Sequence, residues 1–387
     1  MRRVYLDYAA TTPLDPEVFR AMEPYFTDRY GNASSLHHFG REARAALDES
    51  RETIAHLIGA QAGEVLFVSS GTEADNFALK GIAAGMVSRG KNHIITDSAE
   101  HHAVLEPCAF LGRNGFSVTT LPVDDTGRVD PHTLGKGVRP QTGLVSVMHA
   151  NNEVGTINPI ADIARVARAN GIVMHTDAVQ SFGKIPVNVD DLGVDLLSLS
   201  AHKIYGPKGI GALYVRKGVG IERFMHGGGQ ERGRRAGTEN VPLAVGFARA
   251  AVLAYELMEA TAKASGALRD RLTSRLRERF PYILLNGPGE DVLPAIVNIS
   301  FDSRRIEIDG ESLLFNLDLA GVAAASGSAC TSGSMEPSHV LLAMGRDMAT
   351  AKASVRFSIG RMTGGEEIDY AVDALEEVVR RIGKQRN

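Results

Sequence analysis

The sequence predicts an α/β protein with a mostly parallel sheet in a large domain, followed by a smaller α+β domain. Short apolar runs alternate with helical periodicity from about residue 65 to residue 214, as in repeated strand–helix–strand units. Strands expected at 295–301 and 353–359 lie among helices, which is typical of an α+β domain. The 387 residues are enough for two domains. We expect residues 14–260 to form the large domain, and residues 1–13 and 261–387 the small one.

Composition narrows the class of protein. The chain is 44% hydrophobic and 23% charged, which is ordinary for a globular enzyme. A net charge of −4 argues against broad binding to nucleic acid or to an anionic membrane. We find no apolar run of about 18 residues and no secretory signal in the opening MRRVYLDYAATTP. Two cysteines, Cys108 and Cys330, cannot build a disulfide framework, so we expect a reducing cytoplasm.

The first strand–helix unit suggests a phosphate site. We expect helices at 17–25 and 41–58, a strand at 65–69 and a helix at 74–84. The turn between this strand and helix contains Ser70, Gly71 and Thr72. Free amides and the helix dipole favour an anion at such a helix start, and Thr72 would add a hydroxyl. The alternative is a plain helix cap made by Ser70 or Thr72.

Later strands each end in polar residues. Strands are expected at 93–96, 116–122, 144–148, 172–176, 194–199 and 210–215, with helices at 103–111 and 161–169 and a linker opening at 129–134. His101 and His102 follow one strand, but adjacent histidines cannot both face one ion, so we expect no metal and favour His101 facing a cofactor ring. Asn152, Asp177 and Gln180 follow two further strands.

Lys203 directly follows the buried strand at 194–199, with Ser200 and His202 beside it and a Gly206-Pro207 turn behind it. Open α/β sheets bind ligands at such strand ends. A lone lysine there is usually solvated, but this one has polar neighbours. A lysine for a Schiff base and an acid for a ring nitrogen, here Asp177, are what pyridoxal phosphate (PLP) requires.

The last third contains two further candidates. Arg356 lies mid-strand among apolar residues, and a buried arginine should meet an anion. Cys330 lies among small polar residues, which suits a nucleophile, whereas Cys108 on an apolar helix face suits a core thiol. Residues 224–240 are rich in Gly and Arg, either as a mobile basic loop or as a functional loop that bridges two subunits. Helices are expected at 241–264, 268–280, 310–319 and 368–382.

Several stretches together resemble one family. They are VYLDYAATTPLDPEV, YGNASSLH, SSGTEADN, AEHHAVLEP, NNEVGTINPI, HTDAVQSFGKIPV, SLSAHKIYGPKGIGALYVR, HGGGQERGRRAGTEN, SGSACTSGSMEPSHVLLAMG and VRFSIGR. In this order they resemble the cysteine desulfurases of the NifS/IscS branch, within the class-V aminotransferases, and they cover nearly the whole chain. The resemblance implies a fold type I PLP enzyme that is a homodimer. It also implies L-cysteine as substrate, L-alanine as product and sulfur left as a persulfide on the enzyme.

The resemblance assigns roles to the cofactor residues. Lys203 would hold PLP as a Schiff base and move the α-proton, Asp177 would pair with the pyridine nitrogen, and His101 would stack on the ring. The phosphate would be held by Thr72, the Glu73 amide, Ser200, His202 and, from the other subunit, Thr238.

The resemblance also assigns roles to the residues that bind the substrate or react with it. Asn152 and Gln180 would bond the substrate carboxylate side and the ring oxygen, and Arg356 would bind the carboxylate as a bidentate fork. The Cys330 thiolate would attack the substrate sulfur. The stretch around Cys330 resembles the long-loop group, in which the loop moves between the active site and an iron–sulfur scaffold protein.

The sequence also allows functions other than that of a cysteine desulfurase. One is another fold type I reaction, such as selenocysteine lysis or β-elimination, which need not use a protein thiol. Another is an idle sulfur carrier or assembly platform that tolerates loss of Lys203. Cys330 could also be a transient iron–sulfur ligand at a partner interface, although one thiolate alone holds no cluster. The resemblance does not decide which pathway receives the sulfur: general iron–sulfur assembly, nitrogenase maturation, or tRNA and cofactor thiolation.

Overall fold

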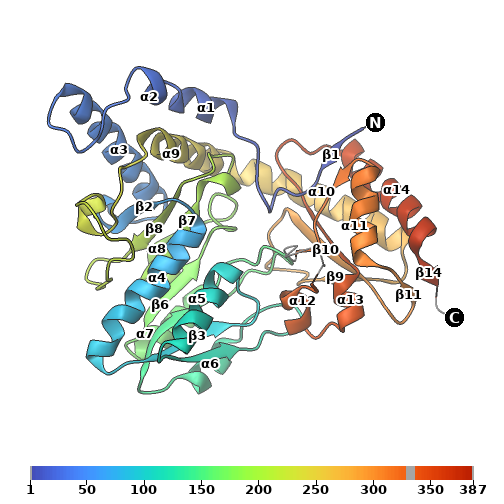
Figure 1. Cartoon of the computed structure of the whole chain (residues 1–387). Helices are drawn as coiled ribbons and strands as arrows, with labels where there is room; N and C mark the ends of the chain where they lie inside the picture. The colour runs from blue at the N-terminus through green and yellow to red at the C-terminus, as the bar shows by residue number, and fades with distance from the viewer. Residues whose placement is uncertain (1, 328–335, 386–387) are drawn as a thin grey trace.

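A seven-stranded sheet forms the centre of the large domain in the computed structural model, which describes residues 2–327 and 336–385 (Figure 1). Its strand order is β2-β8-β7-β6-β5-β3-β4. The strands are β2 Val65–Val68, β3 His93–Asp97, β4 Ser117–Leu121, β5 Thr142–Ser146, β6 Val173–Asp177, β7 Leu196–Ser200 and β8 Gly211–Val215. Only β8 runs against its two neighbours, and the other pairs in this sheet are parallel. The predicted fold class is confirmed.

Both faces of this sheet are covered, which explains why its central strands are apolar without alternation. Along β8, Ala212 and Tyr214 join the core under α3, α7 and α9, while Leu213 and Val215 join the core under α4 and α5. The helices of this domain are α1 Pro16–Met22, α2 Pro24–Thr27, α3 His38–Leu57, α4 Gly71–Met86, α5 His102–Arg113, α6 Pro131–Gly137, α7 Ile160–Ala169, α8 Val189–Leu192 and α9 Val241–Glu256. Short 3-10 turns occupy Ala62–Glu64, Val87–Arg89, Ala201–Lys203 and Glu231–Gly233.

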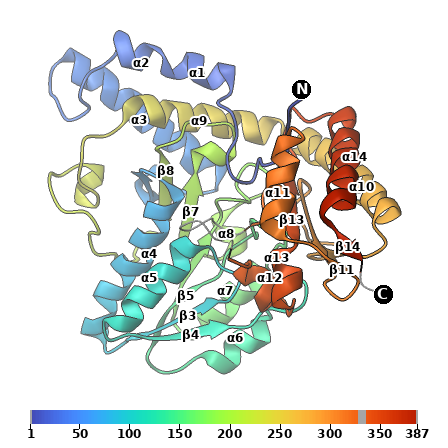
Figure 2. The same ribbon diagram turned by 45° about the vertical axis from the view of Figure 1, so that its right-hand side comes forward.

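A second core lies in the C-terminal part of the chain. The antiparallel sheet β13-β10-β9 packs against α10, α11 and α14, and the shared core includes Val4 and Leu6 from the N-terminus (Figure 2). The elements are β1 Val4–Tyr5, α10 Met258–Arg279, β9 Ile283–Asn286, β10 Ile296–Phe301, β11 Ile306–Glu307, α11 Gly310–Leu319, β12 Val322–Ala323, α12 His339–Ala343, α13 Met348–Lys352, β13 Ser354–Ser358, α14 Gly365–Ile382 and β14 Lys384–Gln385. The separate cores support the predicted division at residues 13/14 and 260/261, which stays a prediction.

Two helix predictions were wrong. Residues 131–137 form α6 instead of a linker, because Asp130 caps the helix and Pro131 occupies its first position. The expected helices at 241–264 and 268–280 are α9 and α10, which break at Leu257 with a bend of 67°. No single helix in the described part of the chain is long and apolar enough to cross a membrane. Taken together, α9 and α10 are long and apolar enough, by length and composition only. Helix α9 packs on the core beside the seven-stranded sheet and α10 packs on the second core, so tertiary contacts decide where the chain bends.

The Gly- and Arg-rich segment 224–240 is tied to the large domain by ion pairs. Glu231 makes a bidentate pair with Arg51 of α3, at 2.6 and 2.9 Å, and both side chains are buried. The same carboxylate accepts the Phe67 amide of β2 at 3.1 Å. Arg235 pairs with Glu73 of α4 at 2.9 Å. This segment is therefore held against the sheet and the start of α4.

Replacing Arg51 with alanine should lower the free energy of unfolding by about 3–5 kcal/mol, because Glu231 would remain buried without its partner. Urea unfolding measures the loss. Arg269→Ala is the matched control, since Arg269 pairs with Asp270 at the surface and should cost less than about 1 kcal/mol. A loss in Arg51→Ala no larger than in this control would contradict the assignment.

Candidate active site

One pocket at the carboxyl ends of β3, β5, β6 and β7 collects most of the predicted site residues. These residues are Thr72, His101, Asn152, Asp177, Gln180, Ser200, His202 and Lys203, and they are joined by Ser70, Gly71, Asp75, Met148, Ala150 and Val179. Parallel strands place their carboxyl ends at one edge of a sheet, so residues far apart in sequence converge here.

Lys203 ends the 3-10 turn that follows β7. Its Nζ donates to the carbonyl oxygens of Ala9 and Ala10, both at 2.7 Å. Burial lowers the pKa of Lys203 to about 8, with a further decrease from Arg356 and an opposing effect from Asp177. A substantial fraction of this amine is therefore neutral near pH 8, as a nucleophilic lysine requires.

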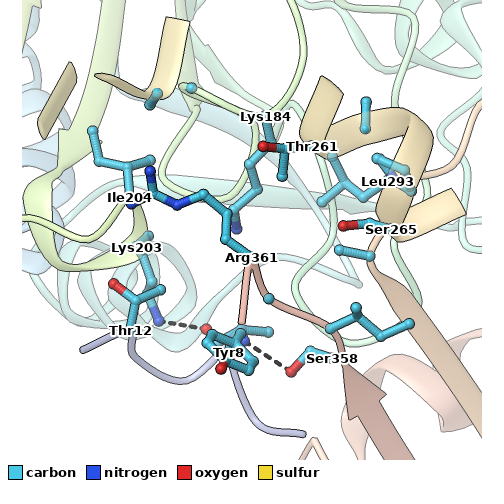
Figure 3. A pocket seen from close by; sticks show the side chains of 18 of the residues that line it. Tyr8, Thr12, Lys184, Lys203, Ile204, Thr261, Ser265, Leu293, Ser358 and Arg361 are labelled. Atoms are coloured by element: carbon cyan, nitrogen blue, oxygen red, sulfur yellow. Dashed lines mark hydrogen bonds between the residues drawn. The ribbon is translucent and has the colours of Figure 1, made fainter. Parts of the chain in front are cut away.

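Lys203 also lines a second cavity, which residues of both domains surround (Figure 3). Tyr8, Lys184, Thr261 and Arg361 contribute to its wall. The Ala9 amide donates to Ser358 Oγ at 2.8 Å, so the N-terminal segment that holds Lys203 is also attached to β13. The position of the lysine thus depends on the N-terminal segment and, through Ala9, on β13.

Asp177 is buried and is the last residue of β6, whereas the sequence placed it directly after the strand. Its Oδ1 accepts the Val179 amide at 2.8 Å. Burial raises its pKa to about 6, and this hydrogen bond and the charge of Lys203 oppose the increase. The carboxyls of Asp75, which also lines the pocket, and of Glu100 are buried nearby, and burial and neighbouring carboxylates raise their pKa values well above normal. Neither was predicted from the sequence, although Asp75 lies one turn after Gly71 on the same helix.

Exchanging Asp177 for asparagine should lower turnover by roughly 10²–10⁴-fold while PLP still binds, because a neutral amide cannot hold a proton on the ring nitrogen. Steady-state kinetics and the visible absorbance spectrum measure this. Asp97→Asn is a matched control: Asp97 is also buried at a strand end, its pKa is about 7, and it does not line the pocket. Equal losses in both variants would argue against a role for Asp177 in the pocket.

The start of α4 forms the other end of the pocket. Ser70 caps the helix by accepting the Glu73 amide at 3.1 Å, so this amide already has a partner. The Glu73 side chain pairs with Arg235 and does not line the pocket. Ser200 Oγ is buried in the pocket wall without a hydrogen-bond partner among the described residues. A Cβ at Gly71 would come within 2.7 Å of Val179, so glycine permits close approach here.

Two histidines border this pocket, and both are held neutral. His101 caps α5 by accepting the Ala103 amide at 3.0 Å on Nδ1. His202 Nδ1 lies 3.1 Å from Thr11 Oγ1. Desolvation by surrounding protein atoms, with a further decrease from Lys203, lowers each pKa to about 4. Each ring is therefore uncharged at neutral pH and available for stacking or hydrogen bonding.

Arg356 meets an anion, as the sequence required, and the anion is Asp7. One guanidinium nitrogen donates to Asp7 Oδ1 at 2.7 Å and another donates to the Asn152 carbonyl at 2.9 Å. Its Nε is buried without a partner in the part of the chain that the structure describes. Gln180 Nε2 donates to the Ala9 carbonyl at 2.9 Å. No sequence signal pointed to Asp7, which lies 349 residues away from Arg356.

Besides Glu73 and Arg356, one more predicted residue within the described part of the chain lies outside this pocket. Thr238 is exposed and does not line the pocket of its own chain, which leaves open the predicted contribution to a second subunit. Cys330 lies outside the described residues.

The pocket suits a cofactor that carries an aldehyde, a basic ring nitrogen and an anionic group. Lys203 supplies the amine and Asp177 the carboxylate. The unpartnered Ser200 hydroxyl and the start of α4 suit a phosphate. These groups and the seven-stranded sheet define a PLP-dependent enzyme of fold type I.

Comparison with known proteins agrees with this class. The family Aminotransferase class-V matches residues 4–371. The chain is similar to the cysteine desulfurase IscS of Dictyoglomus turgidum, with 51% identity over 98% of this chain and 95% of that protein. Among solved structures it is similar to a NifS-like protein (TM-score 0.91, 40% identity, covering 98% and 100% of the two chains). It is also similar to SspA in complex with cysteine (TM-score 0.81, 38% identity, covering 92% and 98%). The chain belongs to the class-V aminotransferase family, in the NifS/IscS branch of cysteine desulfurases.

Proposed function

We propose that this protein removes sulfur from L-cysteine, leaving L-alanine, and passes the sulfur through Cys330 to an acceptor for iron–sulfur cluster assembly. The observation that carries the proposal is the convergence of Lys203, Asp177 and His101 in one pocket, in a chain 51% identical to a cysteine desulfurase.

The residues of the pocket would hold PLP at three points. Lys203 would make the covalent link, Asp177 would face the pyridine nitrogen, and His101 would cover the ring. The phosphate would lie against Thr72, the start of α4, Ser200 and His202. Bound PLP supplies an electron sink for bond cleavage at the substrate carbons. Lys203, with its lowered pKa, would carry a proton to and from the α-carbon.

Arg356 and Cys330 would act on the substrate itself. Arg356 would bind the carboxylate in place of Asp7 and would orient the substrate beside Asn152. The Cys330 thiolate would attack the substrate sulfur, so that an S–S bond forms as the carbon–sulfur bond breaks. The electron pair of the broken bond goes to carbon, which takes a proton to give alanine, and the sulfur stays on Cys330 as a persulfide.

The finer assignments of partner and location belong to the same proposal. A homodimer would bring Thr238 of the second subunit to the phosphate, and the ion pairs that hold segment 224–240 support such a role. An iron–sulfur scaffold protein would take the sulfur. A reducing cytoplasm would keep the Cys330 thiol free to react.

The first experiment is an absorbance spectrum of the purified protein before and after L-cysteine, with alanine and sulfide quantified. We expect a visible PLP band that shifts on addition. With dithiothreitol present to reduce the persulfide, alanine and sulfide should form in equal amounts. Without the reductant, the tryptic peptide that contains Cys330 should gain one sulfur atom. Protein without a band after added PLP, or a band without alanine, would overturn the proposal. Comparing L-selenocysteine with L-cysteine separates it from a selenocysteine lyase.

A further inference from the structure

Lys184 is a half-buried lysine between the two domains, and it has no role in the chemistry above. It lines the same cavity as Lys203, among apolar side chains that include Ile204 and Leu293 (Figure 3). Burial, together with the charges of Lys203 and Arg356, lowers the pKa of Lys184 to about 7. Keeping an amine in apolar surroundings is costly, so its hydrogen-bond partner indicates what it is kept for.

The partner of this amine is the side-chain amide of Gln180. Lys184 Nζ donates to Gln180 Oε1 at 2.8 Å. The two residues are four positions apart in a run of turns after β6, where the Lys184 amide donates to the Ser181 carbonyl at 3.0 Å. A Cβ at Gly183 would come within 2.8 Å of the Ala254 Cβ of α9, so these turns pack closely against that helix. The backbone therefore brings the lysine to the amide from the side of the cavity.

The Gln180 amide is held at its other end by Ala9. Its Nε2 donates to the Ala9 carbonyl at 2.9 Å, and Lys203 Nζ donates to the same carbonyl at 2.7 Å. A carbonyl only accepts, so Nε2 must face Ala9 and Oε1 must face Lys184. Gln180 is 5% exposed and lines the active-site pocket, whereas Lys184 does not line it. Lys184 is therefore connected to the pocket through Gln180.

We propose that Lys184 is a positioning residue, which fixes the Gln180 amide from the cavity between the domains and so directs Nε2 into the PLP pocket. Nε2 carries two hydrogens, of which Ala9 accepts one and the ring oxygen of PLP can accept the other. Without the donor from Lys184, Oε1 would be buried without this partner, and the amide would lose its orientation. The inference rests on the proposed PLP site and on the bond from Gln180 to the ring oxygen that the family resemblance implies.

The central test is the rate at which PLP leaves the diluted holoenzyme, followed by the loss of visible absorbance. Lys184→Met removes the donor from a side chain of similar length, and should speed release roughly 3–10-fold, as expected for one hydrogen bond. Lys184→Arg keeps a donor and should restore most of the wild-type rate. Lys184→Ala, which adds nothing to the cavity, replaces Lys184→Met if that variant does not fold. An unchanged release rate in the folded variant would overturn the proposal.

Lys91→Met is the matched control, because Lys91 is also half-buried but lines neither the cavity nor the pocket. Its Nζ donates to the carbonyls of Thr142 and Gly171, at 2.9 and 3.3 Å. We expect this variant to release PLP at the wild-type rate, and thermal melting shows whether each variant is folded. Equal acceleration in both lysine variants would assign the effect to a general loss of stability and overturn the proposal.

A double-mutant cycle shows whether Lys184 acts through Gln180. Gln180→Ala alone should also speed the release of PLP. Adding Lys184→Met to this variant should change the rate less than about twofold, because the amide that Lys184 positions is gone. An effect of Lys184→Met that is equally large with and without Gln180 would overturn the proposal.

The release of PLP does not depend on turnover, so the comparison separates this inference from the proposed function. If the wild type bound PLP but formed no alanine, the desulfurase function would fall, and the release rates would still decide the role of Lys184. If the wild type held no PLP at all, both would fall.

Discussion

Lys203→Ala is expected to abolish alanine formation from L-cysteine, with a loss of at least about 10³-fold in kcat. Lys203 ends the 3-10 turn after β7 and lines the active-site pocket, and its removal takes away both the covalent attachment point and the proton carrier. The visible band of attached PLP should vanish as well. Absorbance and alanine assays measure both losses.

Lys208→Ala is the matched control, because Lys208 is exposed five residues further along the chain and does not line the pocket. It should keep its PLP band and its activity. A Lys203→Ala protein that still supplied sulfur would favour the idle-carrier alternative instead.

The lowered pKa of Lys203 adds a pH dependence to this prediction. Only the neutral amine attacks an aldehyde, so covalent attachment of PLP to apoprotein should accelerate as the pH rises and level off above about 8. A lysine in water would level off near its ordinary pKa, about two units higher. Stopped-flow absorbance at several pH values measures the midpoint, and a midpoint above pH 10 would contradict the burial of this amine.

Cys330→Ala is expected to remove persulfide formation and to lower sulfide release at least about a thousandfold, while the PLP band remains. The chain has only two cysteines. Cys108 is 2% exposed in the core under α5, and burial, with Glu100 and Asp97 nearby, raises its pKa to about 12. It stays a thiol at neutral pH, so Cys330 is left to supply the thiolate.

Cys108→Ala serves as the control for this experiment. It should lose some stability, because it leaves a small cavity, but should keep persulfide formation. Mass spectrometry of the Cys330 peptide and a sulfide assay distinguish the two variants. Sulfide release at the wild-type rate in Cys330→Ala would remove the protein thiol from the proposed reaction.

Much of the pocket could be predicted because the signals were local. Each of Asn152, Asp177 and Lys203 follows a short apolar run, and parallel strands bring such ends together whatever their separation in sequence. Asp7 and Glu153 could not be assigned partners in this way. Their contacts with Arg356 and Ser338 join parts of the chain 349 and 185 residues apart, and such pairs leave no periodic signal.

The sequence by itself determined the α/β class, the strand ends that carry the chemistry and the residue types that PLP requires, because these depend on apolar periodicity and local turn residues. Only the tertiary structure decided that β8 runs antiparallel, that the helix after residue 241 bends at Leu257, and that the Glu73 amide donates to Ser70. Each of these depends on which surfaces pack together. The energy of that packing comes from contacts between distant segments, and a local pattern of residues does not contain it.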